Sequence, residues 1–200
     1  MGARYLKKTV NGKTEKILAG TCYGDALDGY YDVLGAILKA KELGYENIFV
    51  QGHSLGSTKV LYTYKKLKQD NHEILKNIKG LILLSLVDIN AVMKAYLGDK
   101  LPYYLDFAEK KDAEGHLKYL MPSDSFIHPI SVKTYLRYLR DYKEIDIDDY
   151  NMVSCIDIPV FMRWGTDNEM TIYKSEDLIQ LVTSKIDHDK KDINCIFGAN

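Results

Sequence analysis

The sequence has few cysteines, no excess of charge of one sign and no long apolar run. Its three cysteines, Cys22, Cys155 and Cys195, are odd in number and form no C-x-x-C pair, so we expect buried reduced thiols rather than a disulfide framework or a zinc site. The longest apolar run, residues 81–87, is far too short to cross a bilayer, and residues 1–8 lack the apolar core of a signal peptide. The sequence therefore predicts a cytoplasmic protein with no membrane partner and no metal.

The charges are balanced and dispersed. The chain has 27 basic and 28 acidic residues, with a formal net charge of −1, so it offers no basic face for nucleic acid. Of its 200 residues, 46% are hydrophobic and 28% are charged, which is ordinary for a soluble domain with one sizeable core. We expect neither disorder nor a nucleic-acid partner.

The most informative pattern present is a serine between two glycines. Gly52-His53-Ser54-Leu55-Gly56 follows an apolar run at residues 48–50 and precedes a helix-like stretch at residues 57–67. This order predicts a strand, a strained turn with Ser54 at its tip, and a helix. Glycine is expected at both flanking positions because a Cβ there would clash with the turn. The turn should point the Leu55 backbone N–H, and the positive end of the helix, at a developing oxyanion.

Two other interpretations use the same glycines. One is a plain Gly/Ser turn without chemistry, although the apolar run and the amphipathic helix around it favour a nucleophile. The other is a phosphate-binding loop, which fails on spacing: counted from Gly52 it needs glycine at Ser57 and lysine at Thr58. No dinucleotide G-x-G-x-x-G pattern occurs there, and we expect no cofactor.

Strand and helix patterns alternate along most of the chain. Asn11-Gly12 predicts a hairpin over residues 5–18, and apolar residues at helical spacing predict a helix over residues 25–43. Strands are expected at residues 47–51, 80–87, 158–164 and 192–197, with a helix at 174–185. The alternation favours an α/β fold with about four parallel strands plus the N-terminal hairpin.

Residues 88–157 interrupt this alternation. The stretch is much longer than a usual connection and carries Pro102, Pro122 and Pro129 between helical segments, expected at residues 103–111 and 132–142. We expect a helical cap over residues 89–157, inserted after the second parallel strand, with a core formed by residues 1–88 and 158–200. Such a cap would select the substrate.

With the motif around Ser54, the strand–helix alternation, the inserted cap and the Trp164-Gly165 turn, the chain resembles the α/β-hydrolase superfamily over nearly its whole length. A finer resemblance, to the siderophore-ester hydrolase group, rests on Met121-Pro122, Pro129-Ile130-Ser131 and Asn168-Glu169. The superfamily resemblance implies a serine hydrolase whose triad runs nucleophile, acid, base along the chain.

Within this resemblance Ser54 is the nucleophile and the Leu55 N–H is an oxyanion donor. The acid is expected just beyond the strand ending at Trp164, where Asp167 and Glu169 stand one residue before and one residue after the position that family spacing gives. We favour Asp167, because the shorter carboxylate commonly orients the histidine, and keep Glu169 as the alternative. The other interpretation of Asp167 is a side chain that stabilises a turn.

No histidine stands where the resemblance places the base, in the loop after the last strand. Only His188 follows Asp167, and it precedes the last strand, at the opposite end of the sheet from the nucleophile; we interpret it as a surface loop residue. No segment before Gly52 resembles the loop that supplies a second oxyanion donor. We therefore expect a fragment or a degenerate copy of a longer hydrolase, nearly inactive by itself.

Three functions share these residues. The favoured one is hydrolysis of a small carboxylic ester or acyl substrate through an acyl-enzyme on Ser54. The alternative is a non-catalytic binding or scaffold protein that keeps the fold and the cap pocket, and acyl transfer to an alcohol or thiol would use the same residues. Without leading strands, the strand before Ser54 would have an unpaired edge, which predicts a homodimer or aggregation through that edge unless the hairpin covers it.

Overall fold

A computed structural model describes residues 4–144, 147, 149–166 and 171–196. The chain divides into two compact units. Leu27–Val92 and Ile145–Asn200 belong to the first, here called the α/β unit, and Met1–Ala26 and Met93–Glu144 to the second, here called the helical unit. Each unit buries apolar side chains of its own.

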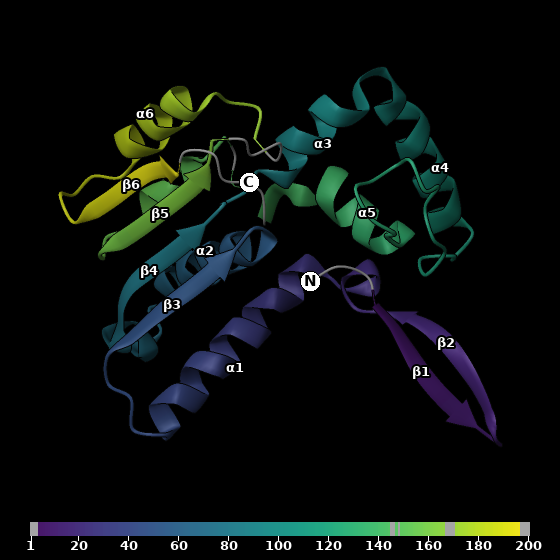
Figure 1. Ribbon diagram of the computed structural model, residues 1–200, viewed down its shortest axis with the longest axis horizontal. Helices are drawn as coiled ribbons and strands as arrows, with labels where there is room; N and C mark the ends of the chain where they lie inside the picture. The colour runs from purple at the N-terminus through teal and green to yellow at the C-terminus, as the bar shows by residue number, and fades with distance from the viewer. Residues whose placement is uncertain (1–3, 145–146, 148, 167–170, 197–200) are drawn as a thin grey trace. The chain divides into compact units, whose positions relative to one another are not determined.

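The α/β unit contains a four-stranded parallel sheet (Figure 1). Its strands are β3 (Ile48–His53), β4 (Ile78–Leu84), β5 (Val160–Gly165) and β6 (Lys191–Ile196), and their order in space follows their order in the chain. Because all four run the same way, their carboxyl ends meet at one edge of the sheet. The expected α/β class and the four parallel strands are confirmed.

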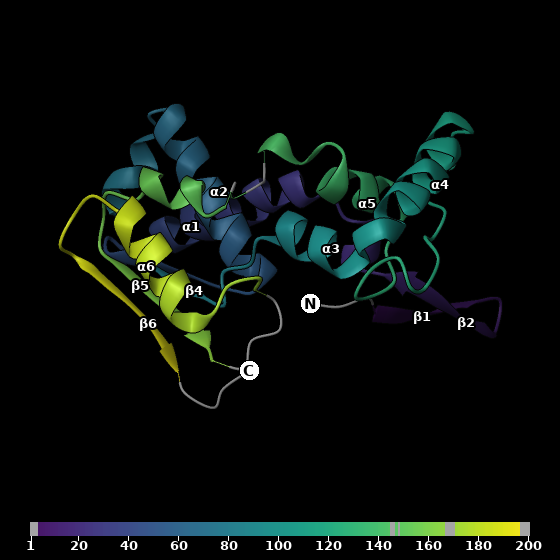
Figure 2. The same cartoon turned by 90° about the horizontal axis from the view of Figure 1, so that it is seen from above.

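Three helices belong to this unit: α1 (Gly29–Glu42), α2 (Leu55–Gln69) and α6 (Ser175–Lys185). Figure 2 shows α2 and α6 on the same side of the sheet. Alternate strand residues point to that side, so that Leu83, Met162 and Trp164 are at most 1% exposed. Helix and loop side chains complete the core, among them Val60, Leu61, Leu67, Tyr150, Val153, Leu178 and Val182. Burying each large apolar side chain contributes roughly 1.5–3 kcal/mol.

The opposite face of the sheet is open in the described part of the chain. Phe49, Phe161 and Ile196 lie on it and are 61%, 37% and 53% exposed. Parallel sheets are ordinarily covered on both faces. The α/β unit therefore presents an apolar sheet surface to its surroundings, and β3 forms one edge of that sheet.

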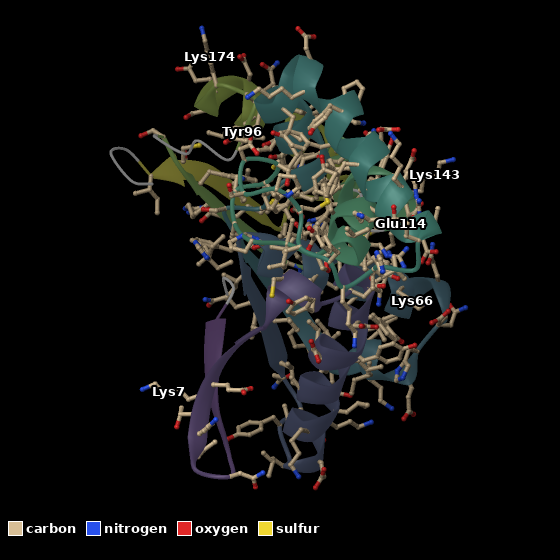
Figure 3. The ribbon with its side chains drawn as sticks, turned by 90° about the vertical axis from the view of Figure 1, so that its right-hand side faces the viewer. Lys7, Lys66, Tyr96, Glu114, Lys143 and Lys174 are labelled. Carbon is tan, nitrogen blue, oxygen red and sulfur yellow. The ribbon has the colours of Figure 1, made fainter. Side chains whose placement is uncertain are left out.

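The helical unit begins with an antiparallel hairpin formed by β1 (Arg4–Val10) and β2 (Lys13–Ala19). Its turn residues Asn11 and Gly12 have φ of 51° and 77°, and positive φ at both positions is what the tight turn favoured by Asn-Gly requires. Lys7 on β1 is exposed and extends outward from the hairpin (Figure 3).

Two helices and most of a third lie in the rest of the helical unit, with turns and bends between them. These are α4 (Leu101–Ala113) and α5 (Val132–Leu139), together with most of α3 (Ile89–Leu97), which starts in the α/β unit. Ser131 caps α5 by accepting a hydrogen bond from the Thr134 N–H, and Arg137 donates two hydrogen bonds, of 2.9 and 3.0 Å, to the Asp25 carboxylate.

Short 3₁₀ helices occur in both units. They lie at Thr21–Tyr23, Ala26–Asp28, Glu73–Asn77, Gly98–Lys100, Tyr142–Glu144 and Asn151–Cys155.

Several expected boundaries are corrected. β4 ends at Leu84 rather than at residue 87, because Ser85 has a φ of 47° and takes the chain out of the sheet. The helix expected over residues 132–142 ends at Leu139 and gives way to a 3₁₀ turn. The helix expected from residue 25 begins at Gly29, after another 3₁₀ turn. Helix α3 was not anticipated.

The chain passes between the two units after Ala26, after Val92 and after Glu144. The hairpin groups with residues 93–144 rather than with the sheet, and residues 145–157 group with the sheet rather than with the helices. Residues 145–157 group with the sheet because Tyr150, Met152 and Val153 belong to the core of the α/β unit. No helix in the described ranges is both long enough and apolar enough to span a bilayer.

A polar cluster joins α2 to the segment that leads into β5. Asp157 accepts hydrogen bonds from the Tyr64 hydroxyl and, at 2.6 Å, from the Lys68 ammonium, which also donates to the Cys155 carbonyl at 2.9 Å. Burial raises the pKa of the Asp157 carboxyl, but the hydrogen bonds from Lys68 and Tyr64 outweigh that effect and hold the pKa below its usual range. The charged form is thus favoured in the folded protein.

Replacing this carboxylate, Asp157→Asn, should lower the free energy of unfolding at pH 7 by less than about 1 kcal/mol, since the side chain is 61% exposed. A depressed folded-state pKa stabilises above the unfolded value of about 3.9, and that contribution is lost as the pH falls through the folded value. The difference from the wild type should therefore shrink between about pH 5 and pH 3 in urea unfolding experiments. Asp187→Asn, at an exposed carboxylate, is the control; an unchanged gap at pH 3 would contradict the assignment.

Candidate active site

Ser54 lies at a sharp turn between β3 and α2. The strand ends at His53, the helix begins at Leu55, and Ser54 has φ 54° and ψ −130°. A positive φ favours glycine, and holding another residue there costs of order 1–3 kcal/mol. Such strain persists only where the surroundings impose it, and it is common at active sites. The strand, strained turn and helix expected from the motif are all present.

Three hydrogen bonds of 2.8 Å hold this turn. The Ser54 N–H and the Ser57 hydroxyl both donate to the Leu84 carbonyl oxygen, at the end of β4, and the Ser57 N–H donates to the Ser54 carbonyl. Ser57 is completely buried. The turn is therefore closed on itself and fastened at both ends to one oxygen of the neighbouring strand.

The two glycines of the motif differ in what they require. A Cβ on Gly52 would lie 2.5 Å from the Gly56 oxygen and 2.5 Å from the Ser57 Cα, so glycine is obligatory there. A Cβ on Gly56 would meet no atom within 4 Å, and Gly56 does not have a positive φ. The expectation that both glycines must lack a Cβ is therefore wrong for Gly56.

The first turn of α2 faces the site with free backbone donors. Ser54 gives no side-chain cap to the helix, and among the described residues the Leu55 N–H has no hydrogen-bond acceptor. An unpaired N–H at a helix N-terminus suits a negatively charged oxygen. The Leu55 N–H is thus available to donate a hydrogen bond, as its expected role as an oxyanion donor requires.

The segment after β4 is anchored from several sides. The Leu86 carbonyl accepts from the Trp164 indole N–H at 2.9 Å and from the Tyr150 hydroxyl at 3.3 Å, and the Val87 carbonyl accepts from the Thr58 hydroxyl at 2.9 Å. Burial raises the pKa of Tyr150, so its hydroxyl stays protonated as a donor. These anchors were not anticipated; the one available signal was a pair of hydroxyl residues directly after the motif.

The described histidines do not bond to Ser54. The Nδ1 atoms of His72, His116 and His128 pair with nearby backbone or carboxylate groups, and His53 is exposed. His188, between α6 and β6, has both ring nitrogens buried, and neither has a hydrogen-bond partner among the described residues. The interpretation of His188 as a surface loop residue is therefore wrong for its ring nitrogens. Its place before β6 puts it at the opposite end of the strands from Ser54.

The candidate acids, Asp167 and Glu169, lie outside the described residues. Thr166 is the last described residue before them, and its N–H donates to the Ile196 carbonyl at 3.0 Å. Residue 166 directly follows β5, at the same edge of the sheet as Ser54. The described residues contain no group of three side chains suited to hold a metal ion.

No family model matches this chain, and no curated protein does. Solved structures do match. A monoacylglycerol lipase from Paleococcus ferrophilus is 20% identical with a TM-score of 0.53, and the match covers 91% of this chain and 69% of that one. A soluble variant of monoglyceride lipase from Saccharomyces cerevisiae, solved with a substrate analogue, is 16% identical with a TM-score of 0.54. That match covers 86% of this chain and 59% of the lipase.

A thermostable carboxyl esterase from Bacillus coagulans, solved with glycerol, is 11% identical with a TM-score of 0.55; the match covers 88% of this chain and 64% of that one. At such identities the likeness shows the fold alone, and the fold is that of the α/β-hydrolases. The chain spans between 59% and 69% of the length of these three structures. None of them supports the finer resemblance to siderophore-ester hydrolases.

Replacing Gly52 and Gly56 by alanine, one at a time, tests whether only Gly52 is required for steric reasons. Gly52→Ala should lower the free energy of unfolding by about 3 kcal/mol or prevent folding, because the new Cβ would press on backbone atoms that cannot yield cheaply. Gly56→Ala, in open space within a helix, should leave the stability unchanged or raise it by up to about 1 kcal/mol. Urea unfolding of both variants measures this, and equal losses would refute the distinction.

Proposed function

We propose that this protein is a serine hydrolase that cleaves small carboxylic esters through an acyl-enzyme on Ser54. The observation that carries the proposal is the strained conformation of Ser54, at the carboxyl edge of a parallel sheet with the α/β-hydrolase fold. Monoacylglycerol lipases and a carboxyl esterase share that fold. Siderophore esters are a further substrate class to assay, on the sequence resemblance alone.

In the proposed reaction the Ser54 Oγ attacks the ester carbonyl carbon and its proton passes to a base. The Leu55 N–H donates to the oxyanion of the tetrahedral intermediate. The intermediate collapses, the alcohol leaves with a proton, and water hydrolyses the acyl-Ser54 ester. Asp167, with Glu169 as the alternative, orients the base.

The chain spans 59–69% of the length of these three structures, and the activity is proposed for the whole protein. Without a base a serine remains a weak nucleophile, so the proposed activity depends on the base that Asp167 or Glu169 would orient. Of residues 89–157, the expected cap, residues 93–144 belong to the helical unit. We propose that these residues act as the cap that selects the acyl and alcohol groups.

A fluorophosphonate probe tests Ser54 directly, because it reacts with activated serine hydroxyls. The full-length protein should be labelled, and Ser54→Ala should abolish the labelling; Ser123→Ala, at an exposed serine, is the matched control. Mass spectrometry of the labelled peptide locates the adduct. A full-length protein that stays unlabelled would contradict the proposal.

The second candidate is a non-catalytic binding protein, favoured by the observation that no described histidine bonds to Ser54. It shares the fold but needs no nucleophile. If Ser54→Ala leaves ligand affinity and cellular effect unchanged while labelling is absent, this candidate replaces the first.

The edge of β3 is the surface through which we propose that two copies pair. An apolar groove of about 370 Å³ runs beside this edge, lined by Val33 and Ile37 of α1, by Ile48 and Val50 of β3, and by Val60 of α2. Unpaired strand edges with exposed apolar residues favour pairing with another strand.

Phe49→Lys places a charge at the exposed position on this edge strand, where lysine opposes pairing. The wild-type mass should rise with protein concentration in sedimentation equilibrium, and the variant should stay monomeric. A wild type that is monomeric at every concentration would refute the pairing.

A further inference from the structure

Ser57 offers its hydroxyl to the same oxygen that holds the backbone of Ser54. Both donor distances to the Leu84 carbonyl are 2.8 Å, and Ser57 is 0% exposed, so water does not compete for this oxygen from the Ser57 side. A carbonyl oxygen has two lone pairs, and these two donors use both. The Leu84 carbonyl is therefore fully used, and both donors come from the turn.

The three bonds form a closed ring. It runs from Leu84 to the Ser54 N–H, along the turn to Ser57, and from the Ser57 hydroxyl back to Leu84, with the Ser57 N–H to Ser54 carbonyl bond across it. A rotation of Ser54 toward negative φ would turn its N–H and its carbonyl relative to one another, so hydrogen bonds on both groups oppose that rotation. A strained conformation needs such over-determination to persist.

We propose that Ser57 is a positioning residue that holds the Ser54 hydroxyl in attacking geometry through the Leu84 carbonyl. This role rests on the proposed function, in which Ser54 is the nucleophile. Ser57 itself touches no substrate, because it is buried beneath the turn. It acts on the rate of attack by narrowing the range of positions that the Ser54 Oγ visits.

Thr58 provides a matched comparison. It is adjacent, 2% exposed, and its hydroxyl also donates to a backbone carbonyl of the same segment, that of Val87, at 2.9 Å. The Val87 carbonyl does not bond to Ser54, so this bond stabilises the fold without entering the ring. Ser57→Ala and Thr58→Val each remove one buried hydroxyl bond, and only the first opens the ring.

The experiment measures two quantities in the full-length wild type, Ser57→Ala and Thr58→Val. The first is the hydrogen exchange rate of the Ser54 amide, which needs no activity. The second is fluorophosphonate labelling, resolved into reversible affinity (KI) and the rate constant of attack (kinact). Both variants should lose similar amounts of thermal stability, since each loses one buried hydrogen bond.

In Ser57→Ala the Ser54 amide should exchange about 10-fold faster relative to the Val60 amide, and kinact should fall about 10-fold with KI unchanged, as expected of a small displacement of the nucleophile. Thr58→Val should keep both quantities within about 2-fold of the wild type. Equal effects in the two variants, or a kinact that Ser57→Ala leaves unchanged, would overturn the positioning role. An unlabelled wild type would instead overturn the proposed function, whatever the exchange rates.

Discussion

The α/β unit depends on the way its second strand ends. At Leu84 the backbone stops pairing as a strand, and the carbonyls that follow are taken up by side chains and backbone groups from other elements. Next along the segment, the Asp88 carboxylate accepts hydrogen bonds from the Ala91 N–H, at the start of α3, and from the Asp149 N–H. An irregular buried segment would otherwise leave unpaired polar groups, each costing about 1–3 kcal/mol. These groups pair with α2, with β5 and with the segment before the 3₁₀ helix at Asn151–Cys155, so the irregular segment becomes the junction that fixes the Ser54 turn.

The sheet is asymmetric in a way that bears on both stability and partners. One face has Trp164, Met162 and Leu83 under helices, whereas the other presents Phe49 and Phe161. A pair of apolar rings in water gives up stabilisation that burial would supply, roughly 1.5–3 kcal/mol for each fully buried ring. Arg163 offsets part of this exposure, because its guanidinium lies 3.9 Å from the Phe161 ring centre and also bonds to Asp192. A polar side chain thus covers an apolar ring that no described helix covers.

Periodicity in the sequence predicted most of the helices and strands, with α3 as the exception, and contacts between distant residues account for much of what it missed. The apolar runs at residues 48–50 and 80–84 indicate strands because each is short and bounded by turn residues, and Asn11-Gly12 indicates a tight turn by its chemistry. By contrast, β4 ends at Leu84 because Ser85 adopts a positive φ, which is rare for serine. The apolar run continues to residue 87 and does not reveal this end. The burial of the His188 ring nitrogens depends on packing that no local pattern encodes. The role of Ser57 is invisible locally for the same reason, since its acceptor lies 27 residues away.

The open space around Gly56 bears on how this site can be recognised in other chains. The first glycine of the motif is imposed by backbone atoms, whereas the second sits beside empty space at the start of a helix. A pattern that demands both glycines combines one steric necessity with one position that is free to vary. Related chains could carry alanine or serine in place of the second glycine and keep the same turn, and a search restricted to the two-glycine pattern would pass them over. The feature to seek is a glycine two residues before the nucleophilic serine, with a hydroxyl side chain three residues after it.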